Sequence, residues 1–154
     1  MELETAYLAG LMHDVGILVF CFLIPAEYCE FIKTIPKNSG SLDEMETTRF
    51  GIAHPELGAM FIEKWWHLDS VIVQAVKNSH FSTSMVNKPI PCAQVVSFAN
   101  EMLNGIGYFN GINTSVNPKV REVLQSLGVP SEDLKKMLEE VKKSLDVMES
   151  VLNA

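Results

Sequence analysis

Residues 6–20 read AYLAGLMHDVGILVF, and this stretch decides the fold because it places an imidazole and a carboxylate, His13 and Asp14, inside an apolar segment. The apolar pattern predicts one buried helix over residues 4–23. Burying a charged group is costly unless the group finds a partner or a metal ion. His13 and Asp14 therefore serve either the structure of the core or its chemistry.

The same segment has a second interpretation, because residues 6–24 are about long enough to cross a bilayer. An aspartate at the centre of a membrane span costs roughly 3 kcal/mol. No Lys or Arg flanks the segment before Lys33, and the N-terminus MELETAY is acidic, unlike that of a signal peptide. We interpret the segment as a buried helix of a soluble protein and expect no membrane contact.

The remaining chain also predicts helices, at residues 25–35, 42–50, 51–66, 69–80, 90–107, 117–128 and 131–152, with turns at 36–41 and 81–89. Ser41 with Glu44 predicts a capping box, and Asp69 predicts a helix N-cap. The apolar faces are expected to contain Tyr28, Phe31, Ile32, Ile35, Leu57, Phe61, Ile62, Trp65, Val71, Ile72, Ala75 and Val76. The prediction is a single all-α domain over residues 1–154, ending in an amphipathic helix at about 131–152.

The amino-acid composition argues against some classes of protein. The formal net charge of −7 argues against a nucleic-acid-binding face, which needs clustered Lys and Arg. Three cysteines, Cys21, Cys29 and Cys92, form no CxxC motif and leave an odd number. This cysteine usage favours a reducing cytoplasm over a disulfide framework.

The four histidines are the candidate functional groups. His13 adjoins Asp14, His54 precedes Pro55 at a helix start, His80 ends a helix, and His67 is expected at the surface. A set of His13, Asp14, His54 and His80 suits a divalent metal such as Zn, Mn, Fe or Ni. The alternative is a buried hydrogen-bond network in which His54 or His80 donates to Asp14. From residue types alone we favour the network.

The order of four segments resembles the HDOD family, the HD-related output domains of bacterial signalling proteins within the metal-dependent HD phosphohydrolase superfamily. These segments are AYLAGLMHDVGILVF, a Glu-containing short helix running into FGIAHPELGAMFIEKWWHL, then VIVQAVKNSH and PCAQVVSFANEML. The resemblance covers residues 5 to about 105 and implies a helical bundle of the HD type. It places the HD dyad on His13 and Asp14, and the histidine of the "H-x-E-x-G" segment on His54.

Three departures from catalytic relatives weaken an enzymatic interpretation. The histidine pair of those relatives matches Ser79 and His80, and their distal metal-binding aspartate matches Asn100. The Gly-Tyr-Pro signature of cyclic-dinucleotide phosphodiesterases is replaced by HFSTSM. The helices that usually precede the HD dyad are also missing, so the chain is a fragment or a shortened version, and we expect uncovered apolar surface and therefore self-association or a protein partner.

Two functions follow. The favoured one is a non-enzymatic signalling module that acts by protein–protein contacts, with Trp65 and Trp66 among the candidate contact residues. The alternative is a metal-dependent phosphohydrolase of nucleotides or phosphodiesters, in which a metal on His13, Asp14, His54 and His80 activates water. Phosphate binding is poorly supported, because Lys64 and Lys77 are the only basic residues near the motifs and no P-loop exists.

Overall fold

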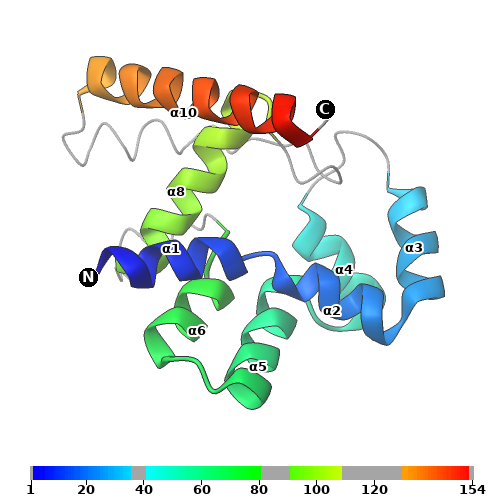
Figure 1. Cartoon of the computed structure of the whole chain (residues 1–154). Helices are drawn as coiled ribbons and strands as arrows, with labels where there is room; N and C mark the ends of the chain where they lie inside the picture. Colours follow the sequence, from blue (N-terminus) through cyan, green and yellow to red (C-terminus); the bar gives the residue numbers. More distant parts are fainter. Residues whose placement is uncertain (1, 36–40, 81–90, 109–129, 153–154) are drawn as a thin grey trace.

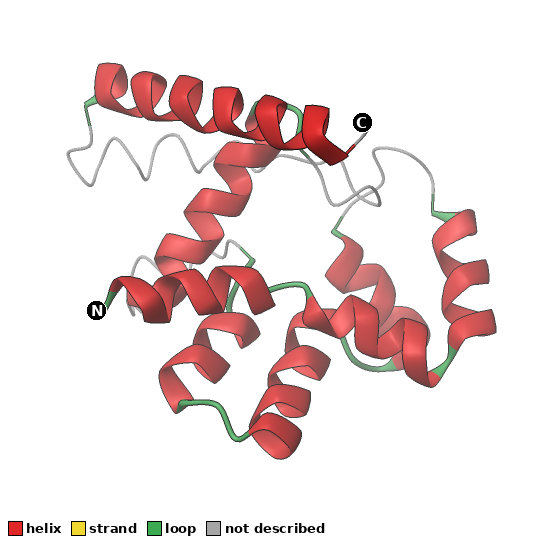
Figure 2. Ribbon diagram, viewed as in Figure 1, coloured by secondary structure: helices red, strands yellow, loops and turns green. Residues whose placement is uncertain are grey.

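The protein is described from a computed structural model that covers residues 2–35, 41–80, 91–108 and 130–152. These residues form helices without any strand (Figures 1 and 2), which confirms the all-α prediction. The helices are α1 (Leu3–Met12), α2 (Val15–Leu23), α3 (Pro25–Thr34), α4 (Leu42–Phe50), α5 (His54–Trp66), α6 (Ser70–Lys77), α8 (Pro91–Gly105) and α10 (Ser131–Leu152). The predicted turns at 36–40 and 81–89 and the predicted helix at 117–128 lie outside the described residues.

The prediction of one helix over residues 4–23 is wrong, because the helix is interrupted at His13 and Asp14. Asp14 has φ −102° and ψ 11°, and its carbonyl accepts a tight bond from the Ile17 N–H at 3.0 Å. Aspartate disfavours helix interiors because its short side chain competes for local backbone groups. The HD dyad therefore lies at a joint between α1 and α2 and not within a regular helix.

The two sides of this joint pack against different helices. The α1 helix contacts α6 and α8, whereas α2 contacts α5 and α3. The main core lies between α1, α5, α6 and α8 and includes Ala9, Ile62, Ala75, Val76 and Ala93, all of them essentially inaccessible to solvent. The joint thus lies where the contacts of α1 with α6 and α8 give way to the contacts of α2 with α5 and α3, and α5 also packs against α6.

The α2 and α5 helices cross at two glycines and make the most extensive helix–helix contact of the described chain. A Cβ atom on Gly16 would lie 1.8 Å from the carbonyl oxygen of His54 and 2.9 Å from the amide nitrogen of Gly58. A Cβ atom on Gly58 would lie 2.8 Å from the amide nitrogen of Gly16. Only glycine permits this approach, which brings the start of α5 against the start of α2.

Aromatic rings join α2, α3 and α4 beside the crossing. The rings of Phe20 and Tyr28 are stacked with centroids 4.7 Å apart, and Phe31 meets Phe50 edge to face at 5.1 Å. Tyr28 is 1% exposed, as its predicted place on the apolar face of α3 requires. This packing fixes α3 and α4 close to the joint.

The predictions made from residues at helix ends are only partly confirmed. Asp69 caps α6 by accepting from the Val71 N–H at 2.7 Å, as predicted, and Gly51 with φ 80° ends α4 at residue 50, the predicted end of this helix. The capping box is wrong, because Ser41 is the N-cap residue of α4 but makes no side-chain cap bond. The glutamate of α4 that makes side-chain hydrogen bonds inside the protein is Glu46.

Several apolar side chains predicted for the core are at the surface. Trp65 is 66% exposed and Val71 is 47% exposed, because the buried faces of α5 and α6 are those of Ala59 and Ile62 and of Ile72 and Val76. Large apolar residues of α1 and α2 are also exposed; we call them the α1–α2 stripe, which consists of Leu3, Tyr7, Leu11, Leu18, Phe22 and Leu23. By length and composition alone Leu3–Leu23 is apolar enough to cross a membrane, with 28% of its most apolar window buried inside the protein.

Candidate functional site

Three side chains from separate parts of the chain meet at the joint between α1 and α2. The Oδ1 atom of Asp14 lies 3.4 Å from Nε2 of His54 and 3.7 Å from Nε2 of His80. His54 is the first residue of α5, and His80 follows the end of α6. The structure therefore brings together three of the four residues that the sequence predicted as a site.

A buried carboxylate sets the orientation of His54. Glu46 Oε2 accepts from Nδ1 of the His54 ring at 2.6 Å and from the His54 backbone N–H at 2.7 Å. The other oxygen of Glu46 accepts from the Tyr28 hydroxyl at 2.5 Å. Glu46 and His54 are both fully buried. The Nδ1 proton is thus held by Glu46, and Nε2 faces Asp14.

A second carboxylate orients His80 in the same way. Both oxygens of Asp43 lie within reach of His80 Nδ1, at 2.9 and 2.8 Å. The two imidazole rings meet edge to face, with centroids 4.9 Å apart. The α4 helix therefore supplies one carboxylate to each histidine, and both Nε2 atoms face the same carboxylate oxygen of Asp14. Carboxylate–imidazole pairs of this kind fix the tautomer of histidines that bind metals.

His13, the fourth predicted residue, contacts the other oxygen of Asp14. Its Nδ1 donates to the carbonyl oxygen of Gly10 at 2.7 Å, and its Nε2 lies 3.4 Å from Oδ2 of Asp14, the oxygen that faces away from the other histidines. His13 is therefore not part of the three-residue group formed by Asp14, His54 and His80. It lies beside Asp14, outside the three-residue group.

Charge compensation controls the ionisation of the cluster. Burial alone would raise the pKa of Asp14, but His54, His80 and His13 together hold it well below its usual range. Burial lowers the pKa of His80, yet Asp14 and Asp43 outweigh this effect and raise it to about 10. Burial likewise opposes the charged form of His54, and Asp14 and Glu46 raise its pKa. Without a metal ion, protons on the histidines balance the carboxylates.

Two atoms at the centre of the cluster have no hydrogen-bond partner: Oδ1 of Asp14 and Nε2 of His54. Both are buried, and unsatisfied buried polar atoms are rare. The distance of 3.4 Å between them is that of an ion pair rather than of a well-formed hydrogen bond. The donor set of two imidazole nitrogens and one carboxylate oxygen, all within 4.8 Å of one another, fits a divalent transition metal.

A second group, Asp43, Glu46 and His54, also brings possible ligand atoms together. Its atoms are already used, because Glu46 binds His54 and Tyr28 while Asp43 binds His80. These carboxylates therefore support the first group and do not form a second centre. The sequence analysis did not identify Asp43, Glu46 and Tyr28 as residues of the site. The only signal for them was the glutamate-containing short helix among the segments that resemble the HDOD family.

The two positions that depart from catalytic relatives add no ligand. Ser79 is fully buried, and its hydroxyl has no hydrogen-bond partner. Asn100 lies in α8 and offers no carboxylate. No salt bridge among the described residues joins a Lys or Arg to Asp14, Asp43 or Glu46. Lys77 pairs instead with Glu56, with Nζ 3.3 Å from Oε1. No described ion pair therefore brings a Lys or Arg to the cluster for a phosphate group.

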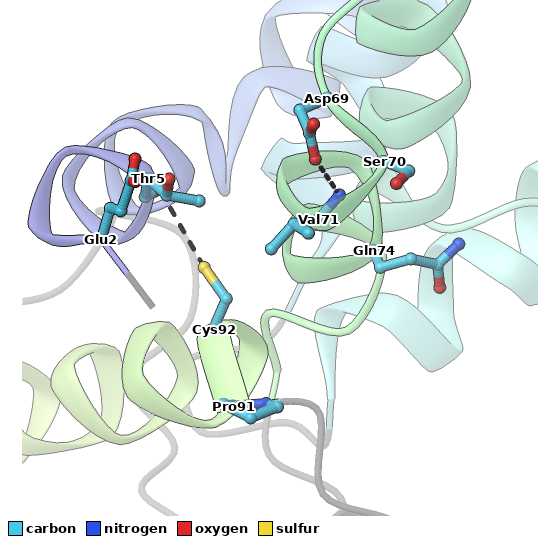
Figure 3. Close-up of a pocket in the computed structure, with 8 residues that line it drawn as sticks. All are labelled: Glu2, Thr5, Asp69, Ser70, Val71, Gln74, Pro91 and Cys92. Atoms are coloured by element: carbon cyan, nitrogen blue, oxygen red, sulfur yellow. Dashed lines mark hydrogen bonds between the residues drawn. The ribbon is translucent and has the colours of Figure 1, made fainter.

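An open pocket lies between α1, α6 and α8, away from the cluster (Figure 3). It is lined by Glu2, Thr5, Asp69, Ser70, Val71, Gln74, Pro91 and Cys92. Two of its polar groups have local partners, since Asp69 caps α6 and the Cys92 thiol points to the carbonyl of Thr5. The pocket therefore brings together no reactive set of side chains, and the cluster at the joint is the better candidate site.

Comparison with known proteins gives one match. The family model of the HDOD domain matches residues 1–82, which include α1 to α6 and the whole Asp14–His54–His80 cluster. No curated protein and no solved structure matches the chain.

Proposed function

Since the HDOD family model matches more than half of the chain, this protein belongs to the HDOD family, a family of signalling-related HD-type modules, and we propose that it is a non-enzymatic module acting by protein–protein contacts. The observation that carries the proposal is that the ion pairs of Asp14, Asp43 and Glu46 are all made with histidines, and that no described ion pair brings a Lys or Arg to the cluster. A phosphohydrolase uses such fixed cationic groups to stabilise the charge on phosphate.

The α1–α2 stripe is the contact surface of this proposal. Leu3 and Phe22 are each 84% exposed, and the stripe extends over both helices, roughly 30 Å at the helical rise per residue. Apart from Asp14, which lies in the cluster, the charged residues before Lys33 are the glutamates at positions 2, 4, 27 and 30, and Glu30 pairs with Lys33 at 3.9 Å. We infer a partner helix with an apolar face flanked by Lys or Arg.

Two synthetic helical peptides with the same leucine face test this inference. One carries flanking lysines and the other carries flanking glutamates at the same positions. At low salt the lysine peptide is expected to bind roughly tenfold more tightly, because only its charges complement the glutamates. Leu18→Ser/Phe22→Ser is expected to weaken binding of the lysine peptide, measured by fluorescence anisotropy.

The control is Thr47→Ser/Met60→Ser, which changes two exposed residues on other helices. Equal binding of the two peptides, or binding that survives the stripe substitutions, would contradict the proposed contact. Hydrolysis of bis-p-nitrophenyl phosphate above the level of an Asp14→Ala variant would contradict the non-enzymatic part independently.

The second candidate function is a metal-dependent phosphohydrolase, supported by the two unpartnered atoms, Asp14 Oδ1 and His54 Nε2. Asp14, His54 and His80 would hold one divalent ion, which when bound lowers the pKa of a water molecule toward neutrality. Glu46 and Asp43 would keep both rings oriented with Nε2 toward Asp14.

Metal content separates the two candidates. For protein purified without an affinity tag or chelator, the hydrolase predicts near-stoichiometric Zn, Mn, Fe or Ni by plasma mass spectrometry, lost in Asp14→Ala. His67→Ala is the matched control, because His67 is exposed at the end of α5. The proposed signalling module needs no metal, and we expect the wild type to bind the lysine peptide equally well before and after treatment with a chelator.

A further inference from the structure

The last helix, α10, is the least anchored helix of the described chain. Each of the other described helices packs against at least one neighbouring helix, whereas α10 makes only sparse contacts with the helices described. In Figure 1 it lies across the end of α8, beyond the core helices. An element with few packing contacts opens locally at a small cost in free energy. The contact between α10 and the end of α8 therefore controls where this helix lies.

The end of α8 is a Schellman motif that fixes the position of Tyr108. Gly107 has φ 94°, and its N–H donates to the carbonyl of Asn104 at 3.1 Å. The Tyr108 N–H donates to the carbonyl of Leu103 at 3.0 Å. A left-handed glycine with these two backbone bonds defines the motif. Tyr108 is thus held by the backbone of α8.

Tyr108 joins this fixed end to one flank of α10. Its hydroxyl donates to Oδ1 of Asp146 at 2.6 Å. At 100° per residue Leu138 and Leu145 lie within 100° of Asp146 around the helix axis, and both leucines are half-buried. Met137 lies opposite Asp146 and is exposed. We call Leu138, Leu145 and Asp146 the docked flank of α10.

The charges around the Tyr108 hydroxyl favour its neutral, donating form. The hydrogen bond to Asp146 raises the pKa of Tyr108 to about 12, and the charges of Asp146 and Glu149 add to this effect. A negative charge in place of the hydroxyl would therefore meet two carboxylates of α10. Like charges at such a contact repel each other and separate the elements that carry them.

We propose that Tyr108 and Asp146 form a latch, in which their hydrogen bond holds α10 on the end of α8 and its loss releases the helix. Release exposes the docked flank to solvent and leaves the core helices folded. The latch uses neither the cluster nor the α1–α2 stripe, so it stands or falls independently of the proposed signalling contact.

The accessibility of engineered thiols tests the latch in the full chain, after the exposed thiols are removed by Cys21→Ser/Cys29→Ser. Leu138→Cys places a thiol on the docked flank, and Met137→Cys places the matched thiol on the exposed side. Mass spectrometry measures their rates of alkylation by a maleimide, and Leu138→Cys is expected to react more slowly. Adding Tyr108→Phe should raise the Leu138→Cys rate about fivefold, the equilibrium effect of one hydrogen bond, and leave the Met137→Cys rate unchanged.

A charge exchange separates the latch from a general loss of packing. Tyr108→Glu should raise the Leu138→Cys rate more than Tyr108→Phe does, because its carboxylate faces Asp146 and Glu149. Tyr108→Glu/Asp146→Lys should restore the slow rate through an ion pair. Tyr7→Phe is the matched control and should change nothing, since Tyr7 is exposed on α1.

Three results would overturn the proposal. The first is equal alkylation of Leu138→Cys and Met137→Cys without any change at Tyr108. The second is a Leu138→Cys rate that does not respond to Tyr108→Phe, and the third is an equally fast rate in Tyr108→Glu and in Tyr108→Glu/Asp146→Lys. Circular dichroism of each variant verifies that the core helices are folded.

Discussion

Gly16→Ala is expected to prevent stable folding. The added methyl group would lie 1.8 Å from the carbonyl oxygen of His54, and this atom belongs to the backbone of α5. A side chain could rotate away, but a helix backbone cannot, so α2 and α5 would have to separate. We expect a loss of at least about 3 kcal/mol in the free energy of unfolding, the upper range for overpacking. Urea unfolding followed by circular dichroism measures it.

Gly10→Ala is the matched control for this prediction. A Cβ atom on Gly10 has no neighbour within 4 Å, and the residue lies inside α1. Alanine there should be neutral or stabilise the protein by up to about 1 kcal/mol, because glycine is a poor helix former. Equal stability of the Gly16→Ala and Gly10→Ala variants would show that α2 and α5 do not cross as closely as described.

Glu46→Ala is expected to cost about 3–5 kcal/mol in the free energy of unfolding, as for removal of one partner from a buried ion pair. The substitution removes the acceptor for the His54 backbone N–H, the His54 ring and the Tyr28 hydroxyl at once. Burial and the nearby Glu46 carboxylate raise the pKa of Tyr28, so the phenol is neutral and needs an acceptor. Thermal and urea unfolding should agree on the size of the loss.

Glu44→Ala is the control, because Glu44 is exposed on the same helix and its loss should change stability little. Glu46→Gln should be intermediate, since the amide retains one acceptor oxygen but presents an NH₂ group to a donor. If Glu46→Ala were as mild as Glu44→Ala, the buried network around His54 would not contribute to the fold as described.

The helices were largely predictable, because their signals are local. The hydropathy pattern of α6, the Asp69 cap and the Gly51 stop act within a few residues, and the structure contains all three. The break at Asp14 was missed because the residues on both sides of it are apolar, so the hydropathy pattern does not change there. Trp65 was misplaced because helical spacing identifies a face but not whether another helix covers it.

The cluster was only partly predictable, because its supporting groups are separated from it along the chain. Asp14, His54 and His80 were found from their residue types and from the family resemblance. Asp43 and Glu46 lie on a short polar helix whose sequence resembles that of a solvated surface helix. Only the packing of α4 against the start of α5 reveals that Glu46 is buried.

The break between α1 and α2 links events at the cluster to the shape of the surface. Asp14 forms one end of the joint and, at the same time, the centre of the cluster formed with His54 and His80. The helix that carries the α1 half of the stripe packs against α6 and α8, and the helix that carries the α2 half packs against α5 and α3. The way the two imidazoles hold Asp14 therefore helps to set the angle between the two halves, and a partner that spans both halves would bind differently if that angle changed.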